Sequence, residues 1–228
     1  MKKEVDVYPD LEPEEDKIYR LAEAVTSLIP AGQVMLHSLI SPPVQRRMES
    51  WIASVEDRLA DLASTGDIDL ALIKNKEEFS ALVLRSIQTA SVTSQQEKLN
   101  YLENFIVNVA RVPEVSEDEL YVLLSILNEF TPSHIRVLHF YAHPEEYASK
   151  IVNVPSDAPP NNQAQGRELA IVFGQGDAEY WQSVFWLVSG HHVVTNHTSP
   201  VKAAMPVEKT VSGRATRLGL KLLNMVVE

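Results

Sequence analysis

Cysteine is absent from the 228-residue sequence, and no apolar run approaches the roughly 20 residues that a membrane-spanning helix needs. Without cysteine, disulfides, thiolate zinc sites and cysteine nucleophiles are excluded. The first residues also lack the apolar segment of a signal peptide. We therefore expect a soluble protein of a reducing compartment, the cytoplasm, with no membrane association.

Sequence signatures of common enzyme classes are missing as well. The run Gly174-Gln175-Gly176 lacks the third glycine of a dinucleotide-binding loop, and no Gly-x-Ser-x-Gly motif occurs. Serine, histidine and aspartate residues are present, but nothing in the sequence pairs them into a catalytic group. We predict that the protein is not an enzyme and that it uses no cofactor.

Basic residues are scarce in the first part of the chain. Residues 1–130 contain 12 Lys and Arg against 23 Asp and Glu, whereas residues 131–228 contain 8 of each. The first part therefore accounts for the whole net charge of −11. Because an acidic surface repels phosphate, any contact with nucleic acid is expected only in the second part.

Apolar residues recur at three- and four-residue steps in the first part, which is the spacing of one helix face. The clearest stripe predicts a helix that ends near Ser64 and is closed by Gly66. Its members are Val44, Met48, Trp51, Val55, Leu59 and Leu62. Ser116 and Glu119 form a capping box at the start of a later helix. We predict a flexible lead-in over residues 1–12 and an acidic helical bundle over residues 13–130.

The second part has a different order of elements. Thr131 and Pro132 predict a helix start, since threonine is a good N-cap and proline is tolerated at the first helical position. A stretch rich in Pro, Asn and Gln at about 153–167 predicts a disordered or loop insertion. Next come a predicted helix, two short β-prone runs (192–195 and 207–211) and a last helix. In a mainly α chain, this order predicts a winged-helix-like α+β domain over residues 131–228.

Two stretches carry a resemblance to known sequences. The first combines Arg46 and Arg47 with Trp51, and the second combines Thr131-Pro132 with His134. Together they resemble a group of uncharacterised bacterial helical proteins with a winged-helix-like C-terminal region, some of them associated with abortive-infection systems. The resemblance covers roughly residues 28–145 and, more loosely, residues 210–222. It implies a fold but no catalytic residues.

The histidines suggest one candidate metal site. His139 and His143 lie four residues apart on a predicted helix, a spacing that can bring two imidazoles to one metal ion. His191, His192 and His197 offer further donors, but no third ligand is specified. Such pairs often arise by chance, so we predict no bound metal. A metal-dependent enzyme is our third hypothesis of function.

A DNA-binding transcriptional regulator is the second hypothesis. The helix at about 177–189 would enter the major groove with Gln182 facing the bases, while Lys209, Arg214 and Arg217 in or beside the wing would contact phosphates. However, the predicted exposed face of this helix carries no Lys or Arg. Recognition helices normally present basic or amide side chains, so the pattern does not favour DNA.

Our first hypothesis is a non-catalytic protein that binds another protein or itself. Trp181 and Phe185 fall on one side of a predicted helix, and Trp186 is rotated away from them. A core helix covered all round would explain these aromatics, but tryptophan is also enriched at binding hot spots. Arg46 and Arg47 could grip a partner carboxylate or phosphate, although pairing with nearby acidic residues is the usual fate of surface arginine. The winged helix would then be a protein-binding module, with Trp181, Trp186, Arg46 and Arg47 as candidates.

Overall fold

The structure is a computed structural model. It describes residues 42–74, 76–111, 115–151, 164–195 and 214–227. The chain divides into two compact units, Met1–Arg47 and Met48–Glu228. The described part of the first unit consists of residues 42–47, where helix α3 begins. The predicted lead-in and the first part of the predicted bundle lie outside the described residues.

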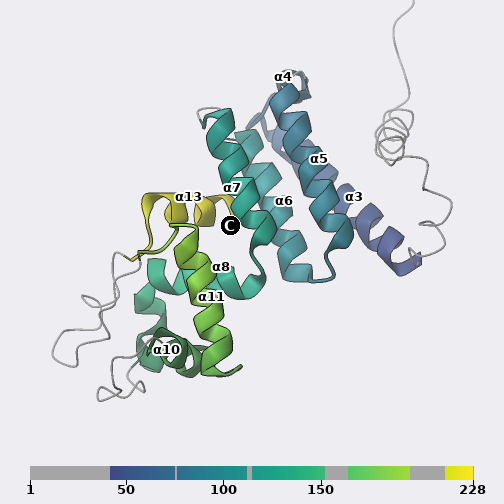
Figure 1. Cartoon of the computed structure of the whole chain (residues 1–228). Helices are drawn as coiled ribbons and strands as arrows, with labels where there is room; N and C mark the ends of the chain where they lie inside the picture. Colours follow the sequence, from purple (N-terminus) through teal and green to yellow (C-terminus); the bar gives the residue numbers. More distant parts are fainter. Residues whose placement is uncertain (1–41, 75, 112–114, 152–163, 196–213, 228) are drawn as a thin grey trace, which may run out of the picture. The chain divides into compact units, whose positions relative to one another are not determined.

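The described residues are mainly helical, as predicted (Figure 1). In chain order the elements are α3 (Pro42–Thr65), α4 (Leu70–Lys74), α5 (Glu77–Val92), α6 (Gln96–Arg111), α7 (Glu117–Glu129), α8 (Pro132–Ala142), the 3-10 helix η1 (Pro144–Tyr147), α9 (Ala148–Ile151), α10 (Ala164–Phe173), α11 (Ala178–Gly190) and α13 (Arg217–Val226). No strand occurs in the part of the chain that the structure describes, where Val194 and Ala215 form an isolated antiparallel bridge. The second predicted run of the wing, 207–211, lies outside that part. None of the described helices is long and apolar enough to cross a membrane.

Helix α3 follows the predicted apolar stripe. Trp51, Val55 and Leu62 are buried, and the helix is followed by Gly66 with φ of +81°. Glycine takes this left-handed conformation without a steric penalty, which explains the stop. The indole N–H of Trp51 also donates a hydrogen bond to the Leu99 carbonyl of α6 at 2.9 Å. Trp51 is therefore both packed and hydrogen-bonded in the core.

The predicted helix starts are confirmed by their capping contacts. The Ser116 side chain accepts a hydrogen bond from the Glu119 amide at 3.3 Å, and helix α8 begins at Pro132 after Thr131. At the start of α11, Asp177 accepts from the Tyr180 amide at 2.7 Å. The Ser116 and Asp177 side chains each satisfy an N–H that has no partner within its helix.

Helix α6 connects several of the other helices. Its buried residues are Lys98, Leu99, Leu102, Glu103, Phe105, Ile106 and Val107, and it packs against α5, α7 and α13. The side-chain amides of Asn104 and Asn108 donate to the Val226 and Met225 carbonyls of α13 at 2.9 and 3.2 Å. These contacts satisfy carbonyls at a helix C-terminus, which lack intrahelical partners.

The predicted boundary between residues 130 and 131 lies inside the second compact unit. Helix α13 packs against α6 and α7 as well as α8, so it joins elements from both sides of that boundary. Gly219 allows the close approach: a Cβ there would lie 2.2 Å from the Val193 carbonyl oxygen and 2.9 Å from Leu138 Cδ1. Sequence composition changes at residue 130, but the packing continues across it.

The predicted insertion at 153–167 needs a correction at its end. Helix α10 begins at Ala164, while residues 152–163 lie outside the described part. The polar, glycine-containing sequence suggested a loop, but Gly166 has a packing role that composition does not show. A Cβ at Gly166 would lie 2.0 Å from the Ala178 carbonyl oxygen. Glycine thus lets α10 lie directly against α11 (Figure 1).

We predict that Trp51→Ala lowers the free energy of unfolding by roughly 3–5 kcal/mol, because it removes a large buried side chain and leaves a cavity. Urea unfolding followed by circular dichroism measures this change. Leu72→Ala is the control, since Leu72 is 64% exposed, and it should change stability by less than about 0.5 kcal/mol. Equal effects of the two substitutions would contradict the core position of Trp51.

Candidate functional site

Helix α11 places Trp181, Phe185 and Trp186 in different surroundings. Trp181 and Phe185 are 0% exposed, whereas Trp186 is 49% exposed, so the predicted rotation of Trp186 is confirmed. Trp181 stacks on Phe173 of α10 with ring centroids 4.6 Å apart and donates its indole N–H to the Gln175 carbonyl. The hypothesis that Trp181 binds a partner is therefore corrected: its ring fills the core between two helices. Trp186 remains a candidate.

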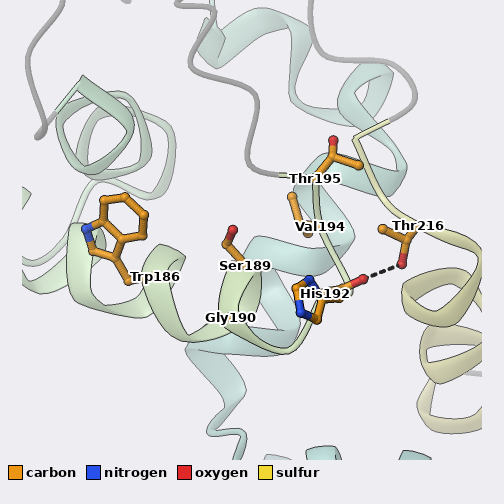
Figure 2. A pocket seen from close by; sticks show the side chains of 7 residues that line it. All are labelled: Trp186, Ser189, Gly190, His192, Val194, Thr195 and Thr216. Carbon is orange, nitrogen blue, oxygen red and sulfur yellow. Dashed lines mark hydrogen bonds between the residues drawn. The ribbon is translucent and has the colours of Figure 1, made fainter.

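An open pocket of about 540 Å³ lies beside Trp186 (Figure 2). The described residues that line it are Trp186, Ser189, Gly190, His192, Val194, Thr195 and Thr216. Figure 2 shows the indole on one side and Val194, Thr195 and Thr216 on the other. This described lining contains no Asp, Glu, Lys or Arg, and its surface is mainly apolar. The pocket therefore suits an uncharged, largely apolar group.

Two short extended segments form the far wall of the pocket. The Thr195 amide donates to the Arg214 carbonyl at 2.7 Å, and the Thr216 amide donates to the Val193 carbonyl at 2.9 Å. These two bonds flank the bridge between Val194 and Ala215. They hold the end of the 193–195 segment against the start of α13, so residues far apart in sequence line one site.

His192 has the most unusual backbone of the lining residues. Its φ of +57° is the only positive value among the described residues other than glycine. The conformation ends α11, with the His192 amide donating to the Ser189 carbonyl at 3.0 Å, and Thr216 Oγ1 donates to the His192 carbonyl at 2.8 Å (Figure 2). Glycine or asparagine is usual at such a position, and an L-residue there costs roughly 1–2 kcal/mol. The chain thus keeps an exposed imidazole beside the pocket at a cost in stability.

A second group of polar residues surrounds Phe130, where α7 ends and α8 begins. The buried ammonium of Lys98 donates to the carbonyls of Leu127 and Phe130, and burial lowers the pKa of Lys98 to about 8. His134 is also buried; burial, with contributions from Lys98 and His191, lowers its pKa to about 4. This group is a structural junction that sequence reasoning missed.

The predicted histidine pair does come together. The rings of His139 and His143 have centroids 4.9 Å apart, and His139 Nδ1 lies 3.2 Å from the Tyr147 hydroxyl. Glu146 Oε2 is 3.9 Å from His139 Nε2, and burial lowers the pKa of His139. In the described part of the chain, however, no three His, Asp or Glu residues are arranged to hold a metal ion. His197 lies outside that part.

Of the DNA-contact candidates that the structure describes, two are buried. Gln182 is buried and accepts a hydrogen bond from the Gly166 amide at 3.0 Å, so the prediction that it faces solvent is wrong. Arg214 is also buried, which argues against a phosphate contact. Arg217 is exposed at the start of α13, and Lys209 lies outside the described residues.

The arginines predicted to grip a partner lie on α3. Arg46 is exposed and Arg47 is partly exposed. Both belong to the first compact unit, whereas Trp186 and its pocket belong to the second. The hypothesis that Arg46 and Arg47 bind a partner carboxylate or phosphate therefore stays a prediction.

Arg214 instead belongs to a buried cluster with Tyr141 and Glu168. Its guanidinium carbon lies 5.2 Å from the centroid of the Tyr141 ring. Burial raises the pKa of Glu168, and the charge of Arg214 opposes that rise. Sequence reasoning missed the cluster because Glu168 adjoined a predicted loop and Arg214 belonged to a predicted surface wing.

Comparisons of this chain with protein-family models, with curated proteins and with solved structures find no match. The resemblance to bacterial winged-helix-like proteins stays a prediction. The function is therefore argued from the geometry of the described residues alone.

We predict that Arg214→Met destabilises the protein by roughly 3–5 kcal/mol, because it leaves the Glu168 carboxyl buried without its positive neighbour. The loss should be much smaller when the same change is made in a Glu168→Gln background, which urea unfolding of the four proteins in the cycle measures. Arg217→Met is the exposed control. If Arg214→Met were as mild as this control, the buried cluster would be contradicted.

Proposed function

We propose that the protein is a non-catalytic binding protein that holds a segment of another protein in the pocket beside Trp186. The observation that carries this proposal is a half-exposed tryptophan next to an open pocket whose described lining contains no Asp, Glu, Lys or Arg. The cores of protein interfaces are depleted of charged residues and enriched in tryptophan, which dominates binding energy when a partner covers it. The partner segment is expected to be uncharged and apolar where it contacts Trp186.

The side chains around the pocket support a peptide rather than a purely apolar ligand. Ser189, Thr195 and Thr216 bring hydroxyl groups to the lining, and the Thr216 hydroxyl already donates to the His192 carbonyl. Hydroxyls at the edge of an apolar surface can bond the amides and carbonyls of a bound chain. Trp186 would supply buried area, and the hydroxyls would orient the segment.

A winged-helix-like domain used for protein binding remains part of this proposal. The bridge between Val194 and Ala215 lies where the predicted wing would start. DNA binding by this domain is less well supported, because Gln182, the predicted base contact, and Arg214, a predicted phosphate contact, are both buried. Protein binding requires neither residue at the surface.

We predict that peptides selected from a random phage-displayed library on the purified protein will be uncharged and apolar, and that Trp186→Ala will weaken their binding at least about tenfold. Fluorescence anisotropy with labelled peptides measures the Kd. Trp186→Ala should leave the melting temperature nearly unchanged, since the side chain is half exposed.

Ile171→Ala is the control, because Ile171 of α10 is also partly exposed, at 39%, and does not line the pocket. It should change the Kd less than about threefold if the pocket is the binding site. Peptides that bind wild type and Trp186→Ala equally well would place binding elsewhere and overturn the proposal.

A further inference from the structure

The junction between α7 and α8 consists of only two residues, Phe130 and Thr131. The Phe130 ring is buried between two imidazoles. His134 stacks on it with ring centroids 5.2 Å apart and planes at 21°, and His191 meets it edge-on at 5.4 Å. Two titratable rings therefore pack against one buried side chain at this junction. We call Phe130, Thr131 and the two histidines the corner.

The hydrogen bonds of His134 define its protonation state. Its Nδ1 accepts the Thr131 backbone N–H at 3.0 Å and lies 2.7 Å from Thr131 Oγ1. An atom that accepts an N–H carries no proton, so the neutral ring must hold its proton on Nε2. In an ordinary capping box this acceptor is Glu or Gln, three residues after the N-cap. Here the same position holds an acceptor that can take up a proton.

The charged groups around His134 oppose its protonation. From α6, Lys98 brings a buried ammonium to the corner. His191, at the end of α11, packs against the same Phe130 ring as His134. Its Nε2 lies 3.0 Å from the Glu129 carboxylate of α7. On α8 itself, Arg136 pairs with Glu97 of α6 at 2.7 Å. The carboxylates of Glu129 and Glu97 thus each contact a side chain other than His134.

We propose that this corner is an acid-operated latch, in which one proton on His134 Nδ1 breaks the cap of α8 and releases the contacts around Phe130. The protonated nitrogen would face the Thr131 N–H as a second donor, so the hydrogen bond between them is lost. Positive charge on the ring would also repel Lys98, which holds the end of α7. The latch does not depend on what the Trp186 pocket binds.

The latch has a defined pH range. Burial, with the charges of Lys98 and His191, lowers the pKa of His134 from 6.5 to about 4. The unfolded chain therefore takes up this proton before the folded protein does as the pH falls. Stability contributed by neutral His134 is complete above pH 6.5 and is lost as the pH falls through 4. The corner is closed at neutral pH and opens in acid.

Opening the corner also affects α11. His191 connects the end of that helix to Glu129 and Phe130, and Tyr180 at its start donates to Ser133 of α8 at 2.8 Å. The next residue after His191 is His192, which lines the pocket. Release of the corner therefore frees the turn that carries one wall of the pocket.

The test compares wild type with His134→Gln, which keeps an acceptor at the capping position but does not titrate in this range. Urea unfolding is measured from pH 7 to pH 4. The folding equilibrium constant of wild type should fall about 100-fold relative to that of His134→Gln. The control His143→Gln, at the other end of α8, should follow wild type. Parallel pH profiles for wild type and His134→Gln would overturn the latch.

A second measurement needs no substitution. The ¹⁵N chemical shifts of the His134 ring distinguish its two tautomers, and the Thr131 amide reports the hydrogen bond. We expect Nδ1 without a proton at pH 7 and a titration near pH 4 that shifts the Thr131 amide in step. A ring that carries its proton on Nδ1 at pH 7, or that titrates without any change at Thr131, would contradict the proposal.

Discussion

The arrangement of the second compact unit depends on the hydrogen bonds that the buried ammonium of Lys98 donates. This ammonium donates to the carbonyls of Leu127 and Phe130, beside the C-terminus of α7, where the helix dipole is negative. Although burial lowers the pKa of Lys98 to about 8, the group stays charged at neutral pH. This contact fixes the direction in which α8 leaves α7, and with it the position of the elements that pack on α8.

Helix α6 extends this role to other parts of the unit. Trp51 of α3 donates to the α6 backbone, while Asn104 and Asn108 of α6 donate to the last carbonyls of α13. Side-chain bonds to helix ends are directional, whereas apolar packing alone tolerates some sliding. These hydrogen bonds to and from α6 explain why the second compact unit includes helices from both sides of residue 130, although the charge balance changes there.

The helices that the sequence predicts best are those whose position is determined by residues close together in the chain. Apolar periodicity and caps such as Ser116 act within a few residues of one another, so the helices that they define were predicted correctly. Gly166, Gln182 and Arg214 were misinterpreted because their surroundings come from distant segments. A glycine in a polar stretch suggests a loop, and a charged or amide side chain suggests solvent, until packing shows otherwise.

One signal for the corner was present in the sequence. Lys98 lies four residues before Leu102 and therefore falls on the apolar stripe of its helix, where a charge needs an explanation. Its partners, however, are backbone carbonyls about 30 residues away, which no local pattern reveals. The pocket beside Trp186 is similar: the exposure of Trp186 follows from helical rotation, but its far wall comes from the segment at Thr216.

The most direct test of this account is the stability of Lys98→Met, a substitution that keeps an unbranched side chain of similar length but removes the ammonium. We predict that the free energy of unfolding, measured with urea at pH 7, falls by about 2–4 kcal/mol, since the carbonyls of Leu127 and Phe130 lose a charged hydrogen-bond donor. Lys150→Met, at an exposed site, should change stability by less than about 0.5 kcal/mol. If Lys98→Met were as stable as wild type, the hydrogen bonds of Lys98 would only offset the cost of burying its charge, and the account of the corner would be contradicted.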